Sequence, residues 1–148
     1  MTTENKQLLL KDLCARLPYR VIAYASEINK NGIITDVNVP YNMVNLTVDN
    51  ESGKYELVPL FDIKPYLRPM SSMTEEEKKV FDDFVCIDEF AWNGNAEKGY
   101  PNQAAIMSDG IDWLLEHHFD FRGLIKKELA LEAPEGMYKR GVANEQLC

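Results

Sequence analysis

The sequence predicts an α+β fold, in which an N-terminal helix precedes a meander of four or five short antiparallel strands and then helices. Apolar spacing changes from a helical period to a two-residue period after residue 18, short turn signals separate β-favouring runs up to residue 60, and a helix-start pattern follows residue 70. We expect residues 1–70 to form a helix with a small β-barrel or sheet. Residues 71–138 should form a helical segment packed on it, and residues 139–148 a frayed tail.

The first predicted element is an amphipathic helix over residues 3–17. Its apolar residues recur at spacings that place them on one helix face: Leu9, Leu10, Leu13, Cys14 and Leu17. Pro18 ends the helix, because proline removes a backbone donor and disfavours helical geometry in the residue before it. Cys14 on this stripe is expected to be a buried, unreactive thiol.

A set of short strands follows, rich in β-branched and aromatic residues. They cover residues 19–25, 33–39, 43–48 and 55–60, with a fifth segment at 63–67 that could close the sheet. Asn31-Gly32 predicts the first hairpin turn, Pro40 separates the second strand from the third, and the polar run that ends at Gly53 predicts another hairpin. Such a meander predicts a small barrel of the Src-homology-three type or an open curved sheet, packed against the first helix.

The clearest helix signal follows the strands. Thr74 and Glu77 form a capping-box pattern, in which each side chain bonds to the other residue's amide. A helix is therefore predicted over residues 75–86. Its buried stripe would be formed by Val80, Phe81, Phe84 and Val85.

The remaining elements are predicted from composition and caps. Residues 87–102 are rich in Asn, Gly and aromatics and are expected to form a loop. A further helix is expected to begin at Ser108 or Asp109, and a last short helix is expected between Gly123 and Leu131.

The net charge of −8 arises in one stretch, because residues 71–125 carry twelve acidic and four basic residues and the rest of the chain is balanced. Direct nucleic-acid binding needs clustered Lys and Arg, so we expect none. The apolar runs are far shorter than the ~20 residues of a membrane helix. No secretory-signal pattern opens the chain, so a cytoplasmic protein that does not bind membranes is expected. Three separated cysteines, Cys14, Cys86 and Cys148, argue against a disulfide framework.

Metal-ligating residue types cluster at His117, His118 and Asp120. Adjacent helical histidines point about 100° apart and the chain has only these two, so the three residues are weak metal candidates. In the structural interpretation His118 packs on the apolar helix face with its ring bonded locally, and His117 faces solvent. Asp120 then caps the next helix or holds Arg122, and neither catalytic residues nor a cofactor is expected. The alternative is a small metal-dependent hydrolase centred on the three residues.

An acidic helix face with nearby loop aromatics is the best candidate for a binding surface. Such a face is usually only solvated, but it can also occupy a partner's basic groove, and exposed aromatics often mark recognition sites. The candidate residues are Glu75, Glu76, Asp82, Asp83, Asp88, Glu89, Trp92 and Tyr100, and Tyr41 is a further loop aromatic. We hypothesise a non-enzymatic module that binds a protein partner. The alternatives are an acidic nucleic-acid mimic that inhibits a DNA-handling protein, and the hydrolase.

Three stretches resemble a family of small uncharacterised proteins from gut anaerobic bacteria and their phages. They run from Leu67 to Glu77 (LRPMSSMTEEE), from His118 to Ile125 (HFDFRGLI) and from Ala130 to Tyr138 (ALEAPEGMY). The resemblance implies a small intracellular accessory protein, often carried by phages or mobile elements. It implies no activity, and no site residue is transferred from it.

Overall fold

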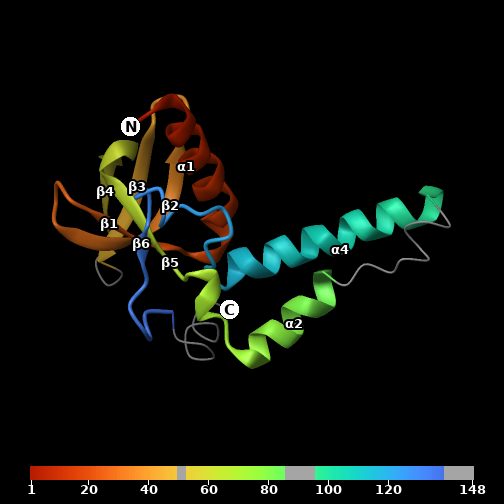
Figure 1. The fold of residues 1–148 in the computed structure, drawn as a ribbon. Helices are drawn as coiled ribbons and strands as arrows, with labels where there is room; N and C mark the ends of the chain where they lie inside the picture. Colours follow the sequence, from red (N-terminus) through yellow and green to blue (C-terminus); the bar gives the residue numbers. More distant parts are fainter. Residues whose placement is uncertain (50–52, 86–95, 139–148) are drawn as a thin grey trace.

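A computed structural model describes residues 1–49, 53–85 and 96–138. It contains two parts (Figure 1): a β-sheet packed against the N-terminal helix, and an arm of two helices that projects away from this body. The arm consists of α2 (Glu75–Val85) and α4 (Ala96–Glu116). No helix within these ranges combines the length and the apolar character needed to cross a membrane.

Helix α1 (Thr3–Arg16) confirms the predicted N-terminal helix, and the Thr2 hydroxyl caps it by accepting a hydrogen bond from the Asn5 amide at 3.1 Å. Its buried face consists of Leu9, Asp12, Leu13 and Arg16. Cys14 is exposed, so the expectation of a buried thiol is wrong. Each helical residue is rotated about 100° from the one before it, so Cys14 lies about 100° away from Leu13. The buried face of α1 is completed by the charged residues Asp12 and Arg16 and not by Cys14.

The sheet has six strands: β1 (Ile22–Ala25), β2 (Lys30–Asn38), β3 (Met43–Asp49), β4 (Lys54–Pro59), β5 (Ile63–Leu67) and β6 (Leu131–Glu132). Their order is β4-β3-β2-β1-β5-β6, and all neighbours are antiparallel except β5 and β6. The predicted antiparallel meander is therefore confirmed for the first four strands, and β5 is added beside β1 rather than beside β4. The barrel is not confirmed: the sheet stays open and mixed, because β6 occupies the edge of β5 that a closed barrel would have joined to β4.

The first hairpin turn lies earlier than Asn31-Gly32, between Ala25 and Lys30, and Asn29 there has a φ of 50°. Gly32 is a residue of β2, where a Cβ would lie 2.9 Å from a side-chain carbon of Leu46 and from the Thr47 carbonyl oxygen. The lack of a side chain at Gly32 therefore allows β2 and β3 to approach closely, and Gly32 does not form a turn. The second predicted hairpin is confirmed, since β3 and β4 pair antiparallel and Gly53 between them has a φ of 67°.

The apolar core lies between α1, the inner face of the sheet and residues 124–130. Its fully buried members include Leu9, Leu13, Ala23, Leu46, Ile63, Leu67 and Leu124. The helix expected between Gly123 and Leu131 is absent, and this segment consists of turns. Gly123 and Glu128 have φ values of 75° and 63°, and a residue in this left-handed region cannot continue a right-handed helix.

Helix α2 confirms the predicted helix and its capping box. The Glu77 amide donates to the Thr74 hydroxyl at 3.1 Å, and the Thr74 amide donates to the Glu77 carboxylate at 3.0 Å. These two bonds satisfy amides that the first helical turn would otherwise leave unpaired.

Helix α4 begins at Ala96, so residues 96–102 are helical and the predicted start near Ser108 lies inside the helix. Gly110 packs against α2, where a Cβ would lie only 3.0 Å from the Cβ of Phe84. Local composition predicted a loop over residues 87–102 because glycine and proline have low helix propensity, and the prediction is wrong for residues 96–102.

Candidate functional site

The polar residues singled out from the sequence meet where the arm joins the sheet. Residues 117–122, here called the junction turn, follow α4 and run beside the end of β5. The Arg68 amide donates to the His118 carbonyl at 2.7 Å, and the Asp120 amide donates to the Arg68 carbonyl at 2.8 Å. The turn is therefore bonded to the sheet through its backbone.

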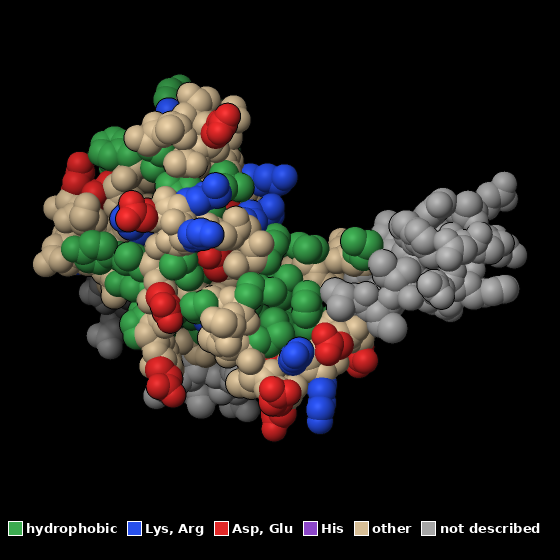
Figure 2. All heavy atoms as spheres, in the orientation of Figure 1, with side chains coloured by type: hydrophobic (Ala, Val, Ile, Leu, Met, Phe, Trp, Pro, Cys, Tyr) green, Lys and Arg blue, Asp and Glu red, His purple; other side chains and the backbone are tan. Residues whose placement is uncertain are grey.

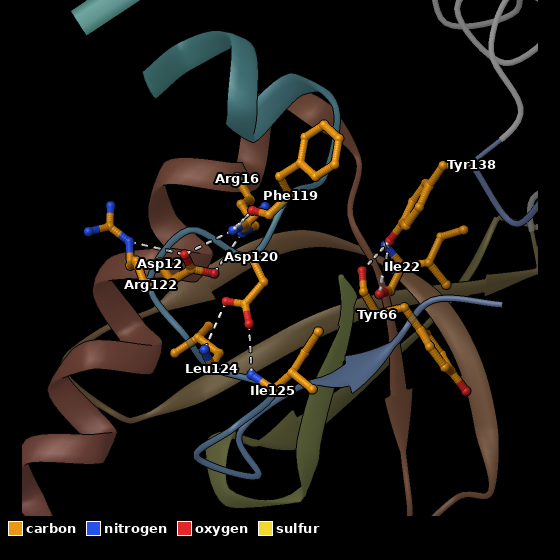
Figure 3. A network of polar contacts seen from close by, with 10 residues as sticks. All are labelled: Asp12, Arg16, Ile22, Tyr66, Phe119, Asp120, Arg122, Leu124, Ile125 and Tyr138. Atoms are coloured by element: carbon orange, nitrogen blue, oxygen red, sulfur yellow. Dashed lines mark hydrogen bonds and ion pairs between the residues drawn. The ribbon is translucent and has the colours of Figure 1, made fainter. Parts of the chain in front are cut away.

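A buried ion network ties the junction turn to α1 (Figure 3). Arg16 Nε lies 2.6 Å from Asp12 Oδ2, and both side chains are fully buried. Arg16 Nη2 donates to the Phe119 carbonyl at 2.7 Å, and Arg122 Nε donates to Asp12 Oδ1 at 3.1 Å. One carboxylate thus faces two guanidinium groups, which keeps a buried charge paired.

Sequence reasoning did not identify this network. The available signal was local: Asp12 and Arg16 are four residues apart and share a helix face with Leu9 and Leu13. A charged pair on an apolar stripe indicates a buried ion pair. Arg122 could not have been added to it, because it lies 110 residues from Asp12 along the chain.

Asp120 has a structural role. Its two carboxylate oxygens accept hydrogen bonds from the amides of Leu124 and Ile125 at 2.8 and 2.9 Å (Figure 3). Arg122 pairs with Asp12, so of the two roles expected for Asp120 the one in which it holds Arg122 is not observed. The carboxylate does cap the segment that follows, but that segment is a series of turns and not a helix.

His118 is buried, as expected, but its ring is not bonded locally. It stacks on the ring of Tyr138 with centroids 3.6 Å apart, and its Nδ1 has no hydrogen-bond partner among the described residues. Burial, together with the charges of Arg16, His117 and Arg68, lowers the pKa of His118 to about 3. The imidazole is therefore neutral at physiological pH.

His117 is half-buried rather than solvent-facing. Its Nδ1 lies 2.8 Å from the Trp113 carbonyl, and its ring stacks on the Trp113 ring at a centroid distance of 4.2 Å. Within the described part of the chain, no three His, Cys, Asp or Glu side chains are grouped so that they could hold a metal ion.

Arg68 fastens the arm to the body. Its Nη2 and Nη1 lie 2.7 and 2.9 Å from the two carboxylate oxygens of Glu77 at the start of α2. The guanidinium also lies over the Phe119 ring, 4.1 Å from its centroid. Burial raises the pKa of Glu77, but hydrogen bonds from Arg68 and Thr74 and the guanidinium charge outweigh it and bring the pKa down to about 2.

The arm exposes acidic residues on both helices: Glu75, Glu76, Asp82 and Asp83 on α2, and Asp109, Asp112 and Glu116 on α4. Large apolar side chains are exposed on the same two helices, namely Val80, Met107 and Ile111. Figure 2 shows hydrophobic side chains gathered where the arm leaves the body, with charged side chains along the rim of the arm.

The remaining predicted surface residues have mixed outcomes. Tyr100 belongs to α4 and not to a loop, whereas Tyr41 lies in the turn after β2 and is exposed, as expected. Asp88, Glu89 and Trp92 lie outside the described residues. The structure therefore places four of the eight predicted residues on one exposed helix.

A cavity of about 500 Å³ lies at the root of the arm. It is lined by residues around the start of α2 and around β6, among them Arg68, Thr74, Glu132, Glu135 and Tyr138. Tyr138 seals one side: its hydroxyl accepts from the Ile22 amide at 2.8 Å and donates to the Tyr66 carbonyl at 2.8 Å (Figure 3). The charge of Arg68 is neutralised by Glu77, so the lining residues Glu132 and Glu135 give the cavity a net negative charge.

No protein-family model, curated protein or solved structure matches the chain. The resemblance to proteins of gut anaerobes and their phages accordingly stays a prediction based on its motifs.

Proposed function

We propose that this protein is a non-enzymatic interaction module whose arm binds a protein partner with a basic surface. The main support for this proposal is that exposed carboxylates and exposed apolar side chains occur together on α2 and α4. Apolar contacts supply most of the binding energy at protein interfaces, and complementary charge supplies orientation and association rate. The cavity at the root of the arm is also lined by acidic residues, so the negative charge of the arm surface continues into it.

The polar side chains near the junction turn are engaged in structural contacts, which favours a binding role for the protein over a catalytic one. Both oxygens of Asp120 bond to backbone amides, and Asp12 is shared between two arginines. His118 is buried against Tyr138 and neutral. A general acid or base needs access to a substrate, and these groups instead hold the junction turn.

A mimic of nucleic acid is the variant of this proposal in which the partner handles DNA. It needs the same acidic arm, and it differs in the partner's identity and in competition with nucleic acid. The phage or mobile-element context implied by the motif resemblance is compatible with either partner.

The test is affinity capture of the tagged protein from a lysate of the cells that make it, with and without nuclease. In the arm variant Asp82, Asp83 and Asp109 are replaced by Lys; in the control variant Glu4, Glu27 and Asp36 are replaced by Lys. All six residues are exposed, so both variants should keep the wild-type circular dichroism spectrum.

We expect the arm variant to lose the partner, with at least about tenfold weaker binding, and the control variant to keep it. A partner that nucleic acid displaces would identify the mimic. Equal binding by both variants would overturn the acidic-arm proposal.

A further inference from the structure

The edge strand β4 carries exposed apolar residues that the arm does not explain. β4 is the first strand in the sheet order and, among the strands that the structure describes, pairs only with β3. Tyr55 and Leu57 are 67% and 58% exposed, and residues two apart in a strand lie on the same sheet face. Natural proteins usually protect such edges, because an apolar edge strand can pair with another chain.

The backbone pattern shows which groups of β4 are free. The Leu60 amide, one residue after β4, donates to the Asn42 carbonyl at 2.8 Å, so the amide of Leu60 is directed toward the β3 side. Bonded and non-bonded pairs alternate along an antiparallel ladder, so Val58 and Glu56 also face β3. The amide and carbonyl groups of Tyr55 and Leu57 therefore point away from β3, toward the open edge.

Pro59 also faces this open edge and has no amide hydrogen, so it limits any added strand to the first part of β4. Lysine on an edge strand ordinarily discourages pairing. Lys54 is followed two residues later by Glu56, however, and both are exposed. Because Lys54 and Glu56 are two residues apart, an antiparallel strand that carries the same two residues can place a glutamate opposite the lysine.

We propose that β4 pairs antiparallel with β4 of a second copy of this chain, with Tyr55 opposite the partner's Tyr55. This register opposes the outward backbone groups of the two tyrosines across a two-fold axis. It also places Lys54 opposite the partner's Glu56, and by symmetry Glu56 opposite the partner's Lys54. Opposite charges at directly opposed positions stabilise a strand pair.

The other symmetric registers that match the outward groups are worse. Placing Tyr55 opposite the partner's Leu57 brings the two Glu56 side chains together, and like charges directly opposed are destabilising. Placing Leu57 opposite the partner's Leu57 sets Glu56 against the partner's Val58. The proposed register instead places Leu57 beside the partner's Gly53, around whose Cβ position the structure leaves open space.

The charge distribution favours a second copy as the occupant. Residues 1–70 carry eight acidic and eight basic residues, so the half that contains β4 is neutral. The acidic excess lies in residues 71–125, and the arm leaves the body from β5, four strands away from β4 in the sheet order. Figure 1 shows β4 and the arm on different sides of the body. The dimer therefore leaves both arms free.

Sedimentation velocity of the full chain under reducing conditions, from micromolar to millimolar protein, tests this proposal. Reduction excludes a disulfide through the exposed Cys14. We expect a concentration-dependent species of twice the 17.0 kDa monomer mass. Glu56→Lys and Lys54→Glu should each weaken dimerisation about tenfold, because each turns two attractive pairs into repulsive ones.

The double variant Lys54→Glu/Glu56→Lys should restore the dimer, since it exchanges the charges and keeps their complementarity. Lys30→Glu, a change of an exposed residue on β2, is the control and should leave dimerisation unchanged. A monomer throughout the concentration series would overturn the proposal. So would a dimer that Glu56→Lys leaves intact or that the double variant fails to restore.

Discussion

The body and the arm are held together by different forces. In the described residues the buried apolar side chains belong to α1, the sheet with its flanking segments, the junction turn and the segment after it, and the arm adds only Leu114 and Leu115 near its root. Among the α2 side chains whose burial the structure describes, the buried one is charged: Glu77, paired with Arg68. Aromatic contacts such as that between Phe81 and Trp113 join the two arm helices.

This difference separates scaffold from recognition element. Elements with few buried apolar contacts open at lower free-energy cost than a packed core. The surface of the arm can therefore be changed with little effect on the body, whereas changes at the junction turn should affect both. The following predictions test that division, beginning with the largest expected effect.

The first prediction concerns the ion network inside the body. Asp12→Asn keeps the side-chain shape but leaves Arg16, which is fully buried, without a carboxylate. Removing one partner of a buried ion pair costs about 3–5 kcal/mol of the free energy of unfolding. Urea denaturation measures this loss, with Lys11→Gln on the exposed side of α1 as the control. A loss equal to that of the control would contradict the role given to the network.

The second prediction concerns His118, whose pKa of about 3 in the folded protein lies below its ordinary 6.5. Between these values the unfolded chain binds the additional proton, so stability falls as the pH falls through this window. The loss is about 1.4 kcal/mol per pH unit. Arg16, Arg68, His117 and Tyr138 surround the ring, and the positive charges among them oppose its protonation.

His118→Phe keeps a ring against Tyr138 and cannot titrate. Its free energy of unfolding should decline less than that of the wild type between pH 6.5 and pH 5, measured by urea denaturation at each pH. This interval lies above the window of Glu77, whose lowered pKa makes its contribution disappear only between about 4.5 and about 2. Parallel pH profiles for the two proteins would refute the prediction.

The third prediction concerns the attachment of the arm. Arg68→Met removes the hydrogen bonds to Glu77 while keeping an apolar stem over Phe119. Hydrogen bonds to charged groups contribute about 1.5–3 kcal/mol. Hydrogen-exchange mass spectrometry should show faster exchange in α2 and unchanged protection in β1 to β3. Glu77→Gln should act in the same direction, and slower or unchanged exchange in α2 would contradict the proposed attachment.

Much of the fold was predictable because its signals are local. The capping box of Thr74 and Glu77, the alternation in the first strands and the turn glycine Gly53 each involve residues close in sequence. The predictions were wrong where contacts between segments far apart in the chain determine the structure. Gly32 is a glycine because Leu46 and Thr47 lie close by, and Cys14 is exposed because a charged pair shares the buried face of α1.

The candidate site was predictable to a smaller extent. The acidic residues of α2 could be placed on an exposed helix from the capping box and the helical period, whereas Val80, predicted in the buried stripe, is 45% exposed. The roles of the junction residues could not, since Asp120 and Arg122 are only two residues apart in the chain but bond to different partners. Sequence proximity suggested a pair that the fold does not make.

The sequence by itself determined the element order up to β5, the start of α2 and the acidic stretch that the arm presents, because periodicity, caps and charge act over a few residues. Only the tertiary structure decided that the sheet stays open, that β6 pairs parallel with β5, and that Asp12 faces both Arg16 and Arg122. These contacts join segments far apart in the chain. Their formation depends on the burial of the whole core, which no local pattern encodes.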